Sequence, residues 1–491
     1  MDERTGFQAT SRGRERPFRP QPPFGLDRPP RDAGARTFSR GDQDRPPARP
    51  DSPRRSPLPR GSSDRRDDRA DSPRATAPGF PRAAGAPPFR DGPRTAGNRT
   101  FGSGQSYRPG PRIAPDTTGL ACLIIQRSGR DQPADRVLRD ALRETPGARR
   151  EQGREVSRRV FAYFRWRAFV DAARPLARQT DEALELAGRF AREPGSFTDA
   201  ELARALPAWV ADRVEVTPAW CRALQAEPAL WLRARPGDGP ELAALLRDTT
   251  APFPALPEAL RFAGTVDLFR TEPFQSGRFE LQDIASQLVG LACAPQPGGT
   301  WWDACAGEGG KTLHLSDLMQ NRGLVWASDR SARRLATLKL RSARARCFNY
   351  RAVAWDGGLK LPTGTKFDGV LLDAPCTGLG TWGRNPHARW TVTPADVGEL
   401  ATVQTTLLRH AAPAVKPGGR LIYAVCTLTR AETLGVADAF AAESTGWEPA
   451  EIPAGLAGAG LLAPAGAGRW WAHPETTGGN GMFVAAWCRA A

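Results

Sequence analysis

The sequence predicts an α/β protein whose C-terminal half is a mostly parallel, doubly wound sheet. Apolar, strand-like segments recur from residue 276 onward, and helical patterns separate most of them. Before residue 200 the pattern differs, because apolar residues recur there at the intervals typical of amphipathic helices. We therefore divide the chain into four parts, 1–116, 117–198, 199–275 and 276–491.

The first part, 1–116, is a tail of low complexity. Segments such as "PRRSPLPRGSSDRRDDRADSPR" mix arginine, proline, aspartate, glycine and serine without apolar periodicity. Such a composition buries too little apolar surface to offset chain entropy, so this tail is predicted to be disordered. The chain carries a formal net charge of +16, and the tail contributes much of it. A basic tail of this kind either contacts RNA loosely or only keeps the chain in solution.

The next two parts contain the predicted helical domain and a connector. In 117–198, the segments "ADRVLRDALRE" and "REVSRRVFAYFRWRAFVDAARPLA" gather apolar residues on one helical face, which predicts a small all-α domain. Residues 199–275 are rich in tryptophan and proline, as in "LPAWVADRVEVTPAWCRAL". This part is predicted to be a small α/β connector.

Composition excludes several classes of protein. Mean hydropathy is -0.47, and no apolar run approaches the ~20 residues of a membrane span. The polar, arginine-rich N-terminus is unlike a secretory signal. The eight cysteines include no CxxC pair and no His/Cys cluster, which predicts free thiols in a reducing cytoplasm and no metal site. The basic balance indicates a polyanionic partner.

Acidic or glycine-rich strand ends predict an adenosine cofactor. The segment "WWDACAGEGGKT" is a strand followed by a glycine-rich turn and a helix start, and glycines let the backbone approach a ligand closely. The next strand ends at Asp329, about 20 residues on, where Rossmann-type folds bind a ribose. A third strand ends at Asp356, where a carboxylate would meet an adenine edge, and a fourth ends at Asp373.

ATP and S-adenosylmethionine compete for this predicted site. The segment "CAGEGGKT" nearly matches the phosphate-binding pattern GxxxxGK[ST], but that pattern requires glycine where Cys305 stands. "GVLLD" resembles the strand that carries the magnesium-binding aspartate of such folds. Phosphate chemistry needs no reactive thiols, and a ribose-binding aspartate after the second strand belongs to the Rossmann pattern. Both points favour S-adenosylmethionine.

Two neighbouring strands each end close to a cysteine. "GVLLDAPCTGLGTWGRNP" contains Cys376 and "GRLIYAVCTL" contains Cys426. Methylation of cytosine at C5 needs such groups: a thiolate that adds to C6, a carboxyl group such as Asp373 that supports charge on the ring, and an acceptor for the C5 proton. Chemistry alone does not decide which thiol is the nucleophile. Five other cysteines are predicted to be small buried hydrophobes, Cys122, Cys221, Cys293, Cys347 and Cys488.

These motifs resemble those of the Sun/RsmB family of RNA (cytosine-5) methyltransferases over about 270–491. "DACAGEGGKT" resembles the family's D-x-C-A-A-P-G-G-K-T loop, and "LLDAPCTGLGTWGRNP" its D-A-P-C-S-G-x-G segment. "YAVCTLTRAE" is similar to Y-S-T-C-S-x-x-x-x-E, "ELQDIASQLV" to Q-D-x-A-S-Q-L, and "GMFVAAWCR" to the last strand. The segment "REVSRRVFAYFRWRAFVD" is similar to the NusB-like RNA-binding domain of RsmB-type enzymes, and "PAWVADRV" to their connector.

The resemblance implies a Rossmann-like, S-adenosylmethionine-dependent methyltransferase domain. It implies that Cys426 is the nucleophile, that Cys376 helps to release the product, and that Arg384 lies near the RNA. It implies an enzyme that forms 5-methylcytosine in ribosomal RNA, in 16S RNA of the small subunit. The sequence leaves the oligomeric state open; we expect a monomer, in the cytoplasm that the free cysteines indicate. The implied cofactor contacts are Cys305, Ala306, Gly307, Glu308, Gly309, Gly310, Lys311, Asp329, Asp356 and Asp373.

Departures from the family pattern keep two alternatives open. Glu308 replaces the loop proline and Gly307 an alanine, while His387 stands where an aspartate is usual. A DNA cytosine-5 methyltransferase would use Cys376 as its nucleophile. A non-catalytic, antitermination-type RNA-binding factor would carry a degenerate sheet, and Glu308 is the feature that supports it. The basic segment 330–346 is either an RNA contact or a solvated helix face.

Overall fold

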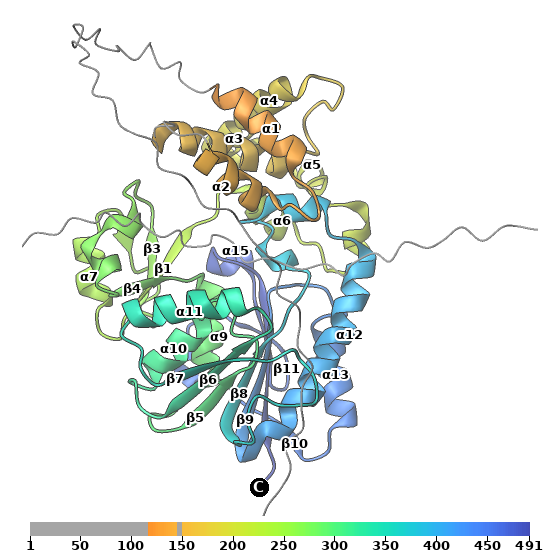
Figure 1. Ribbon diagram of the computed structural model, residues 1–491. Coiled ribbons are helices and arrows are strands. Elements are labelled where there is room, and N and C mark those ends of the chain that lie inside the picture. The colour runs from red at the N-terminus through yellow and green to blue at the C-terminus, as the bar shows by residue number, and fades with distance from the viewer. Residues whose placement is uncertain (1–115, 145–149) are drawn as a thin grey trace, which may run out of the picture. The chain divides into compact units, whose positions relative to one another are not determined.

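The computed structural model of the chain describes residues 116–144 and 150–491 (Figure 1). The predicted disordered tail lies outside the described residues, except for Asp116, whose side chain caps the first helix by accepting from the Thr118 amide at 3.0 Å. No helix within the described ranges is both long and apolar enough to cross a membrane. Four helices follow one another here, α1 (Thr117–Arg127), α2 (Ala134–Glu144), α3 (Arg150–Trp166) and α4 (Leu176–Arg192).

The helices α1 to α4 bury the apolar faces that their periodicity predicts. Val160 and Trp166 of α3 are fully buried. The Trp166 ring lies 5.6 Å from Phe190 and 5.2 Å from Phe197, so an aromatic cluster joins α3 to the end of α4. The structure thus has helices where the sequence predicts them. Their likeness to a NusB-like domain, and the domain boundaries, remain predictions.

A small antiparallel sheet follows, with strand order β2-β3-β1-β4. Leu232, Leu260 and Phe279 are fully buried on one side of it. Its edge strand β4 lies beyond residue 275, the predicted end of the connector. The sequence did not indicate this strand, because three residues show too little pattern to recognise. The elements are η1 (Pro194–Ser196), α5 (Asp199–Ala203), η2 (Ala208–Asp212), α6 (Pro218–Gln225), β1 (Leu230–Ala234), α7 (Gly239–Leu245), β2 (Thr249–Thr250), β3 (Ala259–Phe262), η3 (Leu268–Arg270), α8 (Glu272–Gln275) and β4 (Phe279–Leu281).

The main sheet has strand order β11-β12-β13-β9-β8-β5-β6-β7, and β10 pairs with β13. Strands β5 to β9 pair in parallel, whereas β10 to β13 add antiparallel pairs. Six of these strands are the predicted ones, and β10, β11 and β12 are too short or too rich in glycine to stand out. The strands are β5 (Thr300–Asp303), β6 (Leu324–Asp329), β7 (Tyr350–Ala354), β8 (Phe367–Asp373), β9 (Val415–Val425), β10 (Trp447–Pro449), β11 (Ala463–Gly466), β12 (Arg469–Ala472) and β13 (Met482–Arg489).

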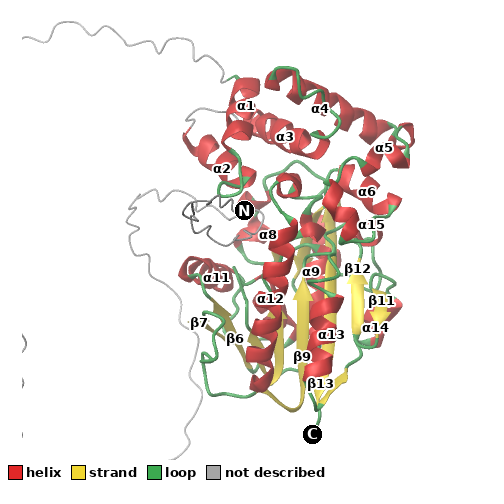
Figure 2. Ribbon diagram, turned by 90° about the vertical axis from the view of Figure 1, so that its right-hand side faces the viewer, coloured by secondary structure: helices red, strands yellow, loops and turns green. Residues whose placement is uncertain are grey.

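Helices cover both faces of the main sheet (Figure 1). Adjacent residues on β8 alternate between the two faces, so Leu371 packs toward α9 and α10 whereas Leu372 packs toward α12 and α13. Helices α12 and α13 run along β9 and β13 (Figure 2). The helical elements are α9 (Ile284–Cys293), α10 (Gly310–Leu318), α11 (Ala332–Arg344), η4 (Leu379–Thr381), η5 (Pro386–Trp390), α12 (Pro394–Ala411), η6 (Ala412–Ala414), α13 (Leu434–Glu443), α14 (Ala454–Gly458) and α15 (Pro474–Thr477).

The strand order reverses between β5 and β8. The chain runs from β5 outward to β6 and β7, then returns to place β8 and β9 on the other side of β5. Open α/β sheets bind ligands beyond the carboxyl ends of strands at such a point. Gly369 makes the β5–β8 contact possible, because a Cβ there would lie 2.3 Å from the Trp301 ring.

Gly290 lets α9 pack closely on α10, the helix that follows the glycine-rich turn. A Cβ on Gly290 would lie 2.1 Å from His314 Nδ1. We expect Gly290→Ala to force the two helices apart and to lower the free energy of unfolding by ~1–3 kcal/mol, measured by urea denaturation. Gly398, a helical glycine of α12 with nothing near its Cβ position, is the matched control. Gly398→Ala should stabilise by up to ~1 kcal/mol, and equal effects at both sites would contradict this view of the packing.

Candidate active site

Three predicted site residues lie at one edge of the main sheet. Strand β6 ends at Asp329, β8 ends at Asp373, and Cys426 directly follows β9. The pairing of β8 with β9 sets Asp373 beside Ala424, and β5 pairs with β8 so that Asp303 lies beside Leu371. The loops that leave these strands therefore start from the same edge, as a parallel sheet requires.

The glycine-rich turn between β5 and α10 is shaped by two positive φ angles. Gly307 has φ 57° and Gly309 has φ 87°. A Cβ on Gly309 would lie 2.6 Å from Leu338 Cγ, so glycine is needed where the turn passes beneath α11. A Cβ on Gly307 would meet nothing within 4 Å, so the turn is open on that side. An open glycine turn at a strand–helix junction fits an adenosine cofactor.

Asp329 is held against this turn, as predicted. The Gly307 amide donates to Asp329 Oδ2 at 3.1 Å, and the Ser331 amide donates to Oδ1 at 2.7 Å. Arg334 Nη1 lies 3.5 Å from the same carboxylate. Each carboxylate oxygen accepts up to two hydrogen bonds, so the group keeps capacity for a ribose hydroxyl. The ribose contact itself stays a prediction.

The turn's other predicted cofactor contacts differ in their surroundings. Burial raises the pKa of the Cys305 thiol, so this thiol stays protonated. The Ala306 amide donates to Ser328 O at 2.8 Å, which ties the turn to β6. Arg341 Nη1 donates to Glu308 O at 3.1 Å and fixes the backbone at the unusual residue of the turn. Their roles as cofactor contacts remain predictions.

Asp356 lies apart from the turn's hydrogen bonds. Its side chain is exposed, and its Oδ1 accepts from the Gly358 amide at 2.8 Å, which closes the turn after β7. That bond uses one acceptor position and leaves the other oxygen available. The second carboxylate oxygen of Asp356 is therefore free to accept a hydrogen bond, and its contact with adenine stays a prediction.

Lys311 links the cofactor turn to the predicted catalytic residues. It is 8% exposed, and its Nζ donates to Asp373 Oδ2 at 2.7 Å. Burial lowers the pKa of Lys311, but the charge and hydrogen bond of Asp373, together with Cys426 and Asp303, raise it more. Lys311 is therefore a buried ammonium group. This ammonium group lies where the cofactor turn meets the predicted catalytic residues.

Asp303, to which the sequence analysis gave no role, is a fully buried carboxyl group at the end of β5. Its Oδ2 accepts from Thr312 Oγ1 at 2.7 Å, while its Oδ1 has no hydrogen-bond partner among the described residues. Burial raises the pKa of Asp303 to about 7; the Thr312 hydrogen bond opposes this shift, and the charge of Asp373 adds to it. Asp303 thus titrates near neutral pH beside Lys311 and Asp373.

The two predicted catalytic thiols are neighbours. Cys376 Sγ lies 3.4 Å from Cys426 Sγ. Cys376 is 2% exposed, whereas Cys426 is half-buried. The hydrogen bond with Cys426 and burial both raise the pKa of the Cys376 thiol. Cys376 thus keeps its proton, and its thiol can donate a hydrogen bond to the Cys426 sulfur.

A single buried carboxylate, Glu432, holds both thiol loops. Thr377 follows Cys376 and donates to Glu432 through its amide at 2.8 Å and through its hydroxyl. Thr427 follows Cys426, and its Oγ1 donates to Glu432 Oε2 at 3.2 Å. Glu432 is fully buried, so these bonds replace its hydration entirely.

The Glu432 network extends to helix α12. Gln404 Nε2 donates to Glu432 Oε1 at 3.0 Å and to Pro375 O at 2.9 Å, and Thr429 Oγ1 donates to Glu432 Oε2 at 2.8 Å. Burial raises the pKa of Glu432, and these hydrogen bonds oppose that shift. Glu432 had no role predicted from the sequence. Two signals marked it: it is the glutamate that ends the segment "YAVCTLTRAE", and the spacing T-x-x-E ahead of α13 is that of a capping box.

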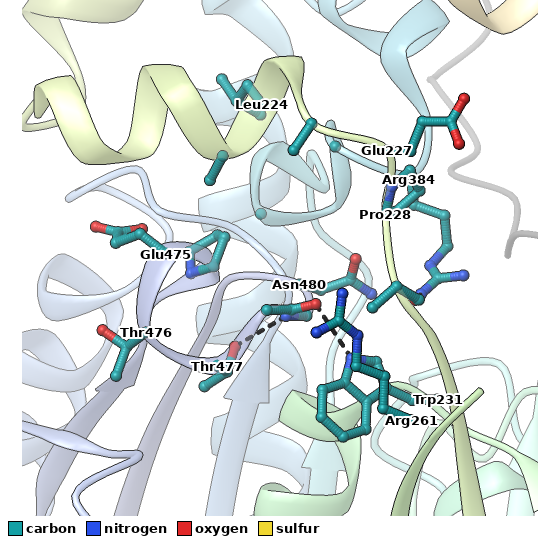
Figure 3. Close-up of a pocket in the computed structure, with 18 of the residues that line it drawn as sticks. Leu224, Glu227, Pro228, Trp231, Arg261, Arg384, Glu475, Thr476, Thr477 and Asn480 are labelled. Atoms are coloured by element: carbon teal, nitrogen blue, oxygen red, sulfur yellow. Dashed lines mark hydrogen bonds between the residues drawn. The ribbon is translucent and has the colours of Figure 1, made fainter. Parts of the chain in front are cut away.

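Arg384 lies in a separate pocket of about 420 Å³ (Figure 3). Its Nη2 donates to Ala229 O at 2.8 Å and lies 3.4 Å from Asp283 Oδ2. Gly380 lines the same pocket, and its amide donates to Cys426 O at 3.1 Å. The pocket therefore adjoins the backbone of the thiol loop. The RNA contact of Arg384 remains a prediction.

The other cysteines lie outside this site. Cys221, Cys293 and Cys347 are buried, as predicted, whereas Cys122 and Cys488 are half-buried. Within 116–144 and 150–491, no group of three His, Cys, Asp or Glu side chains is arranged to hold a metal ion.

Comparison with known proteins relates the sheet domain to methyltransferases. Residues 290–488 match the family described as 16S rRNA methyltransferase RsmB/F. A 248-residue segment is 37% identical to a probable ribosomal RNA small subunit methyltransferase B of Synechocystis sp., covering 48% of this chain and 55% of that protein. A protein of the same description in Bacillus subtilis is 38% identical over 181 residues, 36% of this chain and 40% of that protein. The chain spans about half the length of the curated relatives it matches.

A solved structure shares the fold. The crystal structure of PH0851 aligns with a TM-score of 0.62 and 22% identity, covering 76% of this chain and 99% of that chain. The predicted Rossmann-like methyltransferase fold is confirmed by these matches. The predicted cofactor, S-adenosylmethionine, is confirmed as well, because it is the methyl donor of a domain of this kind.

Removing the Glu432 carboxylate should loosen both thiol loops. Glu432→Ala leaves several buried donors without an acceptor, at ~1–3 kcal/mol each, so we expect the free energy of unfolding to fall by more than ~3 kcal/mol. Glu432→Gln keeps the shape and one acceptor oxygen and should cost ~1 kcal/mol. The control is Glu443→Ala, which removes a half-exposed ion pair with Arg409 and should cost less than ~1 kcal/mol. Urea denaturation in which Glu432→Ala matches the control would refute this role.

The raised pKa of Asp303 should make stability fall with rising pH. A carboxyl group has a pKa of ~4 in an unfolded chain, so from pH ~4 to 7 the folded state binds more protons than the unfolded state. Asp303→Asn removes this titration while keeping an acceptor for Thr312. The variant's free energy of unfolding, relative to the original chain, should therefore be higher at pH 8 than at pH 5.

Asp368→Asn is the control for the Asp303 prediction. Partial burial raises the pKa of Asp368, but hydrogen bonds from Lys416 and Thr300 lower this pKa by a larger amount. Asp368 is therefore ionised at both pH 5 and pH 8. Its effect should be the same at the two pH values. An Asp303→Asn effect that is also independent of pH would show that Asp303 is ionised throughout.

Proposed function

We propose that this chain, whose residues 290–488 form a methyltransferase domain of the RsmB/F family, methylates C5 of a cytosine in ribosomal RNA. The observation that carries the proposal is the pair of sulfurs 3.4 Å apart, at the sheet edge where the cofactor turn lies. Methyl transfer to an oxygen or nitrogen needs no thiol. Methyl transfer to C5 of a pyrimidine does, because C5 becomes nucleophilic only after a thiolate adds to C6.

The chain's own side chains supply the groups that this reaction needs. Cys426, the more exposed thiol, adds through its sulfur to C6 of the cytosine. The Cys376 thiol lies beside this sulfur, and the Lys311 ammonium interacts with it. Asp373 hydrogen-bonds the N3/N4 edge and supports charge on the ring. S-adenosylmethionine, when bound at the turn 305–311, supplies an electrophilic methyl group.

Completion of the reaction requires loss of the C5 proton and cleavage of the sulfur–C6 bond. We assign Cys376 to this release, because its sulfur lies beside the Cys426 sulfur and its thiol is protonated. Water removes the C5 proton, and the electron pair of the C5–H bond re-forms the C5–C6 double bond. The electron pair of the sulfur–C6 bond returns to the Cys426 sulfur, which accepts a hydrogen bond from the Cys376 thiol as it leaves. Glu432 keeps the two thiol loops in register during both steps.

The proposed substrate is RNA of the small ribosomal subunit. The matched relatives in Synechocystis and Bacillus subtilis are named for that substrate. We propose that α1 to α4 act as a NusB-like RNA-binding domain. We also propose that α11 contacts phosphates through the exposed Arg333, since Arg341 and Arg344 at its other end pair with Glu280. We further propose that the chain acts as a monomer in the cytoplasm. The target base has to leave its stack to reach Cys426.

Two alternatives fit the site less well. A DNA cytosine-5 methyltransferase would attack with Cys376, but that thiol is 2% exposed and protonated. A non-catalytic RNA-binding factor would follow if Glu308 blocked the cofactor, yet the turn at Gly307 is open. Isothermal titration with S-adenosylmethionine distinguishes the non-catalytic factor from the proposed enzyme, because a non-catalytic factor would not bind this cofactor.

The two cysteines should give different phenotypes. We expect Cys426→Ala to lower methylation of RNA by at least ~1,000-fold, the usual scale for loss of a nucleophile. We expect Cys376→Ala to accumulate a covalent RNA–protein adduct, visible as a shifted band on a denaturing gel. Cys488→Ala, which changes a half-buried cysteine outside the site, is the control and should do neither. Normal turnover by Cys376→Ala without an adduct would overturn the assigned division of labour.

Bisulfite sequencing of ribosomal RNA tests the substrate. Deletion of the gene should remove protection from one cytosine of the small-subunit RNA, and the intact gene should restore it. A gene carrying Cys426→Ala should fail to restore it. An unchanged pattern after deletion would exclude ribosomal RNA as the substrate.

A further inference from the structure

We infer that the pocket lined by Arg261 and Arg384 binds the nucleotide next to the target cytosine. The two arginines take its phosphate, and Phe253 and Asn480 take its base. This inference rests on the proposed function and adds a second RNA subsite to it. Enzymes that extrude a base also contact the flanking nucleotides of the same strand.

The pocket is close to the thiols but distinct from the cofactor turn. Its walls come from the end of α6 and the segment before β1, from the loop at η4, and from α15 with the segment after it. Gly380 in the η4 loop donates to Cys426 O at 3.1 Å and accepts from the Gly481 amide at 2.8 Å. One wall of the pocket is thus hydrogen-bonded to the backbone that carries the proposed nucleophile. None of the predicted cofactor residues lines the pocket.

Guanidinium groups in the pocket wall have donors to spare. Arg384 uses only its Nη2 in hydrogen bonds to the described residues, so its Nε and Nη1 are available. Arg261 is exposed, and its side chain has no hydrogen-bond or ion-pair partner in the described part of the chain. Paired guanidinium donors suit a phosphate, which they bind in a bidentate manner.

Two buried arginines add positive charge behind the same wall. Arg165 is 4% exposed and donates to Gly383 O at 3.1 Å; Arg389 is fully buried and donates to Leu224 O at 2.6 Å. Both acceptor residues line the pocket. Neither arginine is hydrogen-bonded to a carboxylate within the described residues, and the Nε of each has no partner. Buried charges are normally paired, so this arrangement leaves positive potential at the pocket.

The acidic side chains at the pocket are unevenly placed, and one of them, Asp283, pairs with Arg384. Figure 3 shows Arg261, Arg384 and Asn480 gathered on one side of the pocket, over Trp231. Glu475 lies on the opposite side of the view, whereas Glu227 lies on the same side as Arg384, with its carboxylate pointing outward at the edge. Asp283 partly offsets the charge of Arg384, so Arg261, whose side chain has no partner among the described residues, is the main group for an anion here.

The pocket also has a surface for a base. Phe253 is half-buried, and its ring stacks on Trp231 with centroids 5.7 Å apart and an angle of 11°. Trp231 is held by a hydrogen bond from Nε1 to Gly478 O at 3.1 Å. The Asn480 side chain has no partner among the described residues, so its amide can bond a base edge. A volume of about 420 Å³ accommodates a nucleotide.

Binding of a fluorescent single-stranded oligocytidine RNA to the full chain tests the subsite. We expect Arg261→Gln and Phe253→Leu each to weaken binding about tenfold. Arg261→Gln should also reduce the magnitude of the slope of log affinity against log salt concentration by ~0.7, the value for one phosphate on a single strand. Phe253→Leu should leave that slope unchanged. The matched controls are Arg270→Gln and Phe269→Leu, which change exposed side chains of the connector outside the pocket.

A neutral methylphosphonate at single linkages of the oligonucleotide locates the contact. At one linkage, the methylphosphonate should lower the affinity of the RNA for the original chain. The same substitution should cause no further loss of affinity for the Arg261→Gln variant, because the two changes remove the same interaction. If Arg261→Gln and Phe253→Leu match their controls while the original chain still methylates RNA, the subsite is refuted and the proposed function stands. If the original chain binds S-adenosylmethionine but neither binds nor methylates RNA, the proposed function itself fails.

Discussion

The parallel pairing of β8 with β9 is the contact on which the site depends. It sets Asp373 beside Ala424, so the loops that carry Cys376 and Cys426 leave the sheet side by side. The register is fixed because both faces of β8 are buried, and a slip of one residue would exchange the side chains of the two faces. The sulfur–sulfur distance of 3.4 Å is thus a consequence of how two apolar strands pair.

Strand pairing alone does not fix loops, and Glu432 supplies the remaining constraint. A fully buried carboxylate is costly unless its oxygens are saturated with donors, and here donors come from both thiol loops and from α12. Any movement of one loop would leave buried donors unpaired. The same requirement that the buried oxygens of Glu432 keep their donors therefore also keeps the two sulfurs in place, which is the preorganisation that covalent catalysis needs.

The sequence predicts what local pattern and strand direction determine. The strands that end at Asp303, Asp329 and Asp373 are apolar runs, and parallel pairing brings their ends to one edge whatever the loops do. The position of Asp356 relative to the turn depends on how the segment after β7 folds, which no local pattern specifies. Arg384 bonds Ala229, which lies 155 residues away in the chain. Contacts of that range depend on packing between the connector and the sheet.

The surroundings of the two thiols separate their roles. Cys376 is buried and bonded to its neighbour, so it is protonated, whereas Cys426 is half-buried and close to the Lys311 ammonium. Exposing Cys376 for nucleophilic attack would pull Thr377 away from Glu432 and break two of the bonds that organise the site. Cys426 is already half-buried rather than enclosed, so it can meet a base without such a movement, and Thr427 beside it makes one bond to Glu432, at 3.2 Å. The hydrogen-bond network thus favours one thiol as the attacking group and the other as its partner, although the two side chains are chemically identical.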